Sequence, residues 1–114
     1  MTRSWVIGEA DERQRELYAL VSASQRAGLD AVRAGLAAAD LDAACRGVFV
    51  EAGYGDWFIH GTGHGVGLDI HEDPFLAAAT TASLAPDTRG GFPCSEHVGS
   101  RSFFLSLCPS WGAR

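Results

Sequence analysis

The sequence WFIHGTGHGVGLDIHEDPF occupies residues 57–75 and holds three of the four histidines of the chain, at positions 60, 64 and 71. Glycines at positions 61, 63, 65 and 67 alternate with larger residues. In an extended backbone this period of two sends successive side chains to opposite faces, and the glycines let another backbone or a ligand approach closely. Imidazole is a nitrogen donor suited to Mn, Co, Zn or Fe, and it transfers protons near neutral pH. The stretch is therefore the candidate functional site.

Other chemical motifs fail when they are tested against the same residues. A dinucleotide-binding fingerprint needs a third glycine where Val66 or Leu68 stands, and a phosphate-binding loop needs a lysine, which the chain lacks. A zincin motif would begin at His71 but has Phe75 where its second histidine must be. No G-x-S-x-G sequence is present to carry a nucleophilic serine. One histidine among glycines most often only bonds the backbone of a turn, whereas three within twelve residues favour a shared chemical role.

Two helices are predicted before this stretch. The first runs from about Glu12 to Arg33 behind an Asp11 N-cap, and the second runs from about Asp40 to Ala52, with Gly53 ending it. Each carries one apolar stripe, which predicts that it covers a sheet. The stripes comprise Leu17, Leu20, Val21, Ser24, Gly28, Ala31 and Val32, then Leu41, Ala44, Cys45, Val48, Phe49 and Ala52. The residues before the first helix, Trp5–Ile7, are β-prone and end at Gly8, which predicts a short strand.

Composition limits the class of protein. The chain has 114 residues, which suits one domain, and 9 basic against 14 acidic residues give a net charge of −5. This balance argues against nucleic acid and anionic membranes as partners. No apolar run approaches the roughly 20 residues of a membrane span, and no signal peptide is evident. Three cysteines without a paired spacing favour a reducing compartment, the cytoplasm, and Cys45 is interpreted as a small core residue.

The run from Phe58 to Pro74 closely resembles the signature of the pita-bread metallopeptidases, which include prolidase, Xaa-Pro aminopeptidase, creatinase and methionine aminopeptidase. His60 makes it similar to the proline-specific branch. The resemblance covers roughly residues 2–76, and it implies an α+β fold with helices packed on an antiparallel sheet. Residues 1–86 are then part of a pita-bread catalytic domain whose complete form hydrolyses peptide bonds next to proline.

The resemblance also implies roles for the three histidines. His64 corresponds to the single histidine ligand of a site with two divalent ions (Mn, Co or Zn), where a metal-activated water attacks the scissile carbonyl. His71 and His60 correspond to catalytic residues that contact the substrate, a peptide containing proline. Glu72 and Pro74 are interpreted as shaping the loop. Family members usually dimerise, and whether this chain forms a homodimer stays open.

The two ends of the chain depart from the family pattern. The family uses five metal ligands (two Asp, one His and two Glu), and only His64 is recognisable. Matching Thr2 and Arg3 to the family puts an aspartate before Met1, and the sequence after Pro86 lacks the family's Glu-Pro-Gly. Glu96 is a candidate ligand in an altered context, and residues 87–114 are interpreted as a divergent or frameshifted tail.

Three functions follow as hypotheses. The first is a partial peptidase domain that alone binds metal weakly or not at all and has no significant turnover. The second is a degenerate, non-catalytic family member that binds peptides or a protein partner. The third is a plain metal-binding or structural protein in which the histidines act locally.

Overall fold

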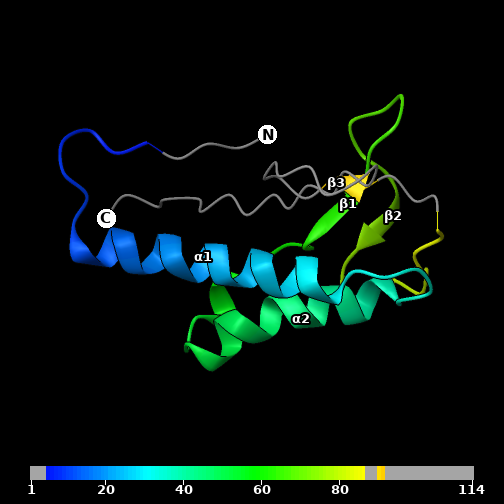
Figure 1. Ribbon diagram of the computed structural model, residues 1–114, viewed down its shortest axis with the longest axis horizontal. Coiled ribbons are helices and arrows are strands. Elements are labelled where there is room, and N and C mark those ends of the chain that lie inside the picture. Colours follow the sequence, from blue (N-terminus) through cyan, green and yellow to red (C-terminus); the bar gives the residue numbers. More distant parts are fainter. Residues whose placement is uncertain (1–4, 87–89, 92–114) are drawn as a thin grey trace.

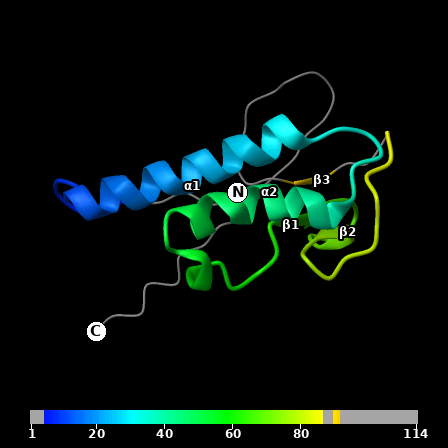
Figure 2. The same ribbon diagram turned by 90° about the horizontal axis from the view of Figure 1, so that it is seen from below.

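The computed structural model describes residues 5–86 and 90–91. Two helices precede a small antiparallel sheet, and the helices run side by side in opposite directions (Figures 1 and 2). The elements in order are α1 (Glu12–Ala31), α2 (Ala38–Glu51), the short 3-10 helix η1 (Gly55–Trp57), β1 (Gly63–Gly65), β2 (Glu72–Leu76) and β3 (Gly90–Gly91).

The sequence prediction of both helices is confirmed to within about two residues at each end. Asp11 caps α1: its side chain accepts a hydrogen bond from the Gln14 amide, and the Gln14 side chain accepts one from the Asp11 amide. This reciprocal pair satisfies two amides that the first helical turn leaves without partners. Gly53 follows α2 with a φ of 79°, in the left-handed region where glycine has no Cβ to strain.

The predicted apolar stripe of α2 faces the core, and α1 packs against it. Ser24 on α1 is fully buried, and its hydroxyl donates to the carbonyl of Cys45 at 2.8 Å. Small residues at this crossing let the two helices approach closely. The core combines α2 with residues just before it, between α2 and β1, at the end of β2 and between β2 and β3. It consists of Leu36, Ala38, Leu41, Cys45, Phe49, Phe58, Leu76 and Leu84.

The described sheet has the strand order β2-β1-β3 and is antiparallel throughout. A Cβ atom on Gly65 would lie 2.3 Å from the carbonyl oxygen of Asp73, so only glycine allows β1 and β2 to pair this closely. The alternating glycines thus admit a neighbouring backbone, one of the two alternatives that the sequence left open. Pro74 lies in β2 at the edge of this sheet, where a residue without an amide hydrogen is tolerated.

The strand predicted at Trp5–Ile7 is wrong. These residues form no strand, and their side chains are largely exposed, with Ile7 fully so. A strand needs a neighbour for its backbone groups, and none of the described strands pairs with this segment. β propensity alone therefore did not decide its conformation.

Neither helix in the described part of the chain combines the length and the apolar character that crossing a bilayer requires.

Candidate functional site

The hairpin of β1 and β2 brings two of the three histidines together. His64 lies in the middle of β1, and His71 immediately precedes β2. Their ring centroids are 4.3 Å apart with 48° between the ring planes. His64 is half-buried and His71 is exposed, so the pair opens to solvent on the His71 side.

The remaining contacts of the histidine rings each involve only one histidine. The ring of His60 packs against Phe58, with 5.7 Å between centroids. Nδ1 of His60 lies 2.8 Å from the carbonyl of Gly61, and Nδ1 of His64 lies 2.9 Å from the carbonyl of Gly65. A carbonyl oxygen only accepts, so Nδ1 is the donor in both contacts, and in the neutral form of each ring Nε2 keeps the lone pair. That tautomer is the one a metal ligand or hydrogen-bond acceptor at Nε2 requires.

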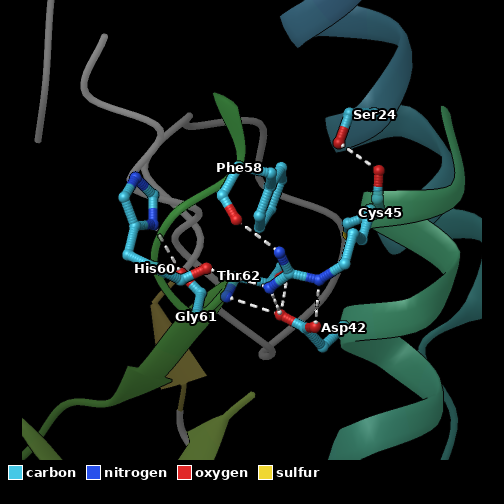
Figure 3. A network of polar contacts seen from close by, with 8 residues as sticks. Ser24, Asp42, Cys45, Phe58, His60, Gly61 and Thr62 are labelled. Atoms are coloured by element: carbon cyan, nitrogen blue, oxygen red, sulfur yellow. Dashed lines mark hydrogen bonds and ion pairs between the residues drawn. The ribbon is translucent and has the colours of Figure 1, made fainter. Parts of the chain in front are cut away.

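A polar network fixes the segment that precedes β1 (Figure 3). Asp42 on α2 is fully buried, and its carboxylate accepts from both the amide and the hydroxyl of Thr62. Arg46, one turn further along α2, pairs with Asp42 at 2.9 Å and donates to the carbonyls of Phe58 and His60. The stretch that carries His60 and leads to His64 is thus fastened to the helix.

Sequence reasoning missed Asp42 and Arg46. A charged pair at i and i+4 usually lies on the solvent face of a helix, where its stabilising effect is small. The available signal is that Asp42 directly follows Leu41 of the apolar stripe and that Arg46 directly follows Cys45. Charges beside a buried stripe need buried partners, which here are backbone groups of residues 58–62.

The loop between β1 and β2 is closed by Glu72. Its Oε1 accepts from the amide of Asp69 at 2.7 Å, and a Cβ atom on Gly67 would lie 2.1 Å from its Oε2. Glu72 therefore shapes the loop, as the sequence indicates. Asp69 itself is exposed.

The carboxylate ligands of a two-metal site are not assembled by residues 5–86 and 90–91. Within these ranges no three His, Cys, Asp or Glu side chains come together as a metal-binding group. His64 offers one donor nitrogen, and carboxylates are what hold two cations close together. These residues alone do not fit a two-metal centre. The candidate ligand Glu96 lies outside the described residues.

The comparisons with known proteins agree with one another. Residues 1–89 match the sequence profile of metallopeptidase family M24. A probable dipeptidase PepE from Mycobacterium bovis is 42% identical over 113 residues, which are 99% of this chain and 28% of that protein. A Xaa-Pro dipeptidase from Pyrococcus furiosus is 47% identical over 77 residues, which are 68% of this chain and 22% of that protein.

A solved structure extends the likeness to three dimensions. The Xaa-Pro dipeptidase from Bacillus anthracis superposes with a TM-score of 0.72 at 39% identity, covering 74% of this chain and 24% of that one. The chain thus spans less than a third of the length of each of these relatives. The two helices and their antiparallel sheet are part of a prolidase-type pita-bread fold of the α+β class, and the chain belongs to metallopeptidase family M24.

Proposed function

We propose that this chain supplies the histidine-bearing part of a proline-directed metallopeptidase, whose complete form hydrolyses peptide bonds next to proline. The observation that carries the proposal is the contact of His64 and His71 on one hairpin, with a 4.3 Å centroid separation. A hydrogen bond from Nδ1 of His64 to Gly65 leaves its Nε2 as the donor atom for a metal. The complete family site uses divalent ions, and Mn, Co or Zn suit an imidazole ligand.

The other two histidines are proposed to contact the substrate. His71 is exposed beside His64, so a peptide bound at His64 would lie within its reach. His60 holds its Nδ1 proton on the Gly61 carbonyl, and its Nε2 would therefore accept a hydrogen bond from an N–H group of the substrate. Both would orient a proline-containing peptide relative to the reacting carbonyl.

The chain alone is proposed to lack significant peptidase turnover, because a single imidazole holds a divalent ion weakly. Purified chain is incubated with Mn²⁺ and an Xaa-Pro dipeptide, and release of proline is followed. Turnover comparable with a complete Xaa-Pro dipeptidase would contradict this part of the proposal.

A chimera tests the peptidase assignment itself. The matching residues of this chain replace the 77 residues to which they align in the Pyrococcus furiosus Xaa-Pro dipeptidase. We expect the chimera to hydrolyse Xaa-Pro dipeptides and to lose that activity on His64→Ala. A folded chimera that is inactive before this substitution would refute the assignment.

The alternative is a non-catalytic family member that binds peptides or a protein partner. It is favoured by exposed apolar side chains that directly precede two of the histidines: Ile59 is 77% exposed before His60, and Ile70 is 77% exposed before His71. Binding of an Xaa-Pro dipeptide without hydrolysis, both in the chain and in the chimera, would support this function over the first.

We also propose a cytoplasmic location, because an odd number of cysteines, one of them the buried free thiol of Cys45, suits a reducing compartment. The net charge of −5 favours peptides over nucleic acid as partners. A homodimer stays a proposal taken from the family.

A further inference from the structure

Asp42 and Arg46 form a two-pronged ion pair one turn apart on α2. Nε of Arg46 donates to Oδ2 of Asp42 at 2.9 Å, and one Nη donates to Oδ1 at 3.2 Å. The Asp42 side chain is fully buried and that of Arg46 is 28% exposed. The guanidinium also lies over the ring of Phe58, 4.2 Å from its centroid, which limits its freedom to turn.

The ion pair forms hydrogen bonds with every second residue of the segment before β1, which are Phe58, His60 and Thr62. Arg46 donates to the carbonyls of Phe58 and His60, the second at 3.0 Å. Asp42 accepts from the amide and the hydroxyl of Thr62, at 3.0 Å and 2.7 Å. Phe58 and His60 offer their carbonyls to Arg46, and Thr62 offers its amide and hydroxyl to Asp42, so every second residue of this segment bonds to α2.

This attachment determines where the ring of His60 points. The carbonyl of His60 accepts from Arg46, and the amide of Thr62 donates to Asp42. The peptide plane that joins the Gly61 carbonyl to the Thr62 amide therefore has little freedom to rotate. The Nδ1 proton of His60 is donated to the carbonyl of Gly61, which belongs to that plane. The ring direction and the tautomer of His60 therefore depend on the backbone that the ion pair holds.

We infer that Asp42 and Arg46 are positioning residues, which act through the backbone to keep His60 in its Nδ1–H tautomer with Nε2 presented outward. The inference rests on the proposed function only for the claim that His60 meets the substrate. Lysine would not replace Arg46, because one ammonium group cannot reach the carboxylate and two separate carbonyls in the fork geometry of a guanidinium.

The test uses the full chain labelled with ¹⁵N and ¹³C, without metal or peptide, at a pH of about 8, above the ordinary pKa of free imidazole of about 6.5. Long-range ¹H–¹⁵N spectra report the tautomer of each ring, and hydrogen exchange reports the Thr62 amide. We expect His60 of the wild type to be mainly Nδ1–H. In Arg46→Lys, we expect His60 to move toward the Nε2–H form that free histidine prefers. The Thr62 amide also donates to the Leu76 carbonyl at 2.7 Å, so we expect its exchange to change little and to report that the hairpin is intact.

Two controls separate positioning from general loss of structure. Arg26→Lys changes an exposed arginine of α1, and exchange of the amide of Leu20, which is partly buried against the core, reports the integrity of α1. The His60 tautomer in Arg26→Lys and the exchange of the α1 amide in Arg46→Lys are both expected to stay at the wild-type values. A folded Arg46→Lys chain in which His60 keeps the wild-type tautomer would overturn the inference.

A second variant and a wild-type measurement keep the test decisive if Arg46→Lys does not fold. Asp42→Asn keeps the size of the side chain and an oxygen for Thr62, so we expect a smaller shift in the same direction, with exposed Asp40→Asn as its control. In the wild type, couplings across the hydrogen bonds from the Arg46 guanidinium to the carbonyl carbons of Phe58 and His60 are expected, and their absence would overturn the inference whatever the variants do. Because no substrate is involved, a failed peptidase chimera leaves these results unchanged.

Discussion

Oδ1 of Asp42 accepts two hydrogen bonds from Thr62, one from the amide and one from the hydroxyl, although the two residues are 20 positions apart in the sequence. Both side chains are fully buried. The same carboxylate oxygen also accepts from Arg46. This atom, together with the bonds from Arg46 to the carbonyls of Phe58 and His60, joins helix α2 to the segment that precedes β1.

Asp42→Ala should strongly destabilise the fold. It removes the carboxylate partner of the Arg46 guanidinium and the acceptor of the Thr62 hydroxyl, while the Thr62 amide keeps its bond to the Leu76 carbonyl; losing one member of a buried pair costs about 3 kcal/mol or more. Urea denaturation followed by circular dichroism measures the change in the free energy of unfolding. Asp40→Ala on the same helix is exposed and should cost no more than about 0.5 kcal/mol. Equal losses in the two variants would show that the buried pair does not stabilise the fold.

Gly65→Ala and Gly47→Ala should act in opposite directions. A Cβ at position 65 would lie 2.3 Å from the carbonyl oxygen of Asp73, which is backbone and cannot move aside, so about 2–3 kcal/mol should be lost. A Cβ at position 47, inside α2, meets nothing within 4 Å, and replacing a helical glycine by alanine should add about 1 kcal/mol. Urea midpoints of both variants give the sign directly, and a Gly65→Ala chain as stable as the wild type would contradict the close strand approach.

The Cys45 thiol should resist alkylation in the folded chain. Burial raises the pKa of Cys45 from its ordinary value of 9.0 to about 11, and the nearby Asp42 carboxylate adds to this rise. The thiolate is the reactive form, so iodoacetamide at a pH of about 8.5 should modify the peptide containing Cys45 far more slowly than in urea. Mass spectrometry of that peptide separates it from the other cysteines. Similar rates in the two conditions would contradict the burial.

Because the pKa of Cys45 is raised, we expect the free energy of unfolding to fall in alkaline solution. The folded state binds this proton more tightly than the unfolded state, so the stabilisation is complete below pH 9.0 and is lost as the pH rises through about 11. Urea midpoints across this range should fall more steeply in the wild type than in Cys45→Ala, which lacks the titrating group. Parallel curves would show that other groups cause the fall.

Asp11→Ala should weaken the start of α1. The substitution removes the acceptor for the Gln14 amide and half of the reciprocal cap, which is typically about 1 kcal/mol. Asp30→Ala is the matched control, because Asp30 is exposed near the other end of the same helix, where a negative charge is unfavourable. Thermal unfolding should show a loss for Asp11→Ala and a small gain for Asp30→Ala. A gain for both would mean that the cap contributes nothing.

The helices were predictable because their signals are local. The Asp11 cap, the apolar spacing and the glycine at position 53 all act within a few residues of the element they limit. The failed strand at Trp5–Ile7 shows the converse. Its β propensity was real, but a strand also depends on a partner elsewhere in the chain, which a local pattern does not contain.

The candidate site was likewise predictable only where its signals are local in the sequence. The pattern of histidines and glycines marked residues 57–75, and the glycine spacing anticipated a close neighbouring backbone. The role of Asp42 was not predictable, because its identity as a buried acceptor depends on Thr62, and helical periodicity only classifies faces of α2. The assignment of His60 and His71 to the substrate stays a prediction.

The positions of His64 and His71, whose rings are in contact, depend on different interactions. His64 follows a segment fastened to α2 through Thr62, whereas His71 stands in a loop whose shape depends on the local contact between Glu72 and Asp69. Changes in that loop can therefore redirect His71 while His64 stays where it is. The direction of one imidazole of the contacting pair can thus change while the other keeps its place.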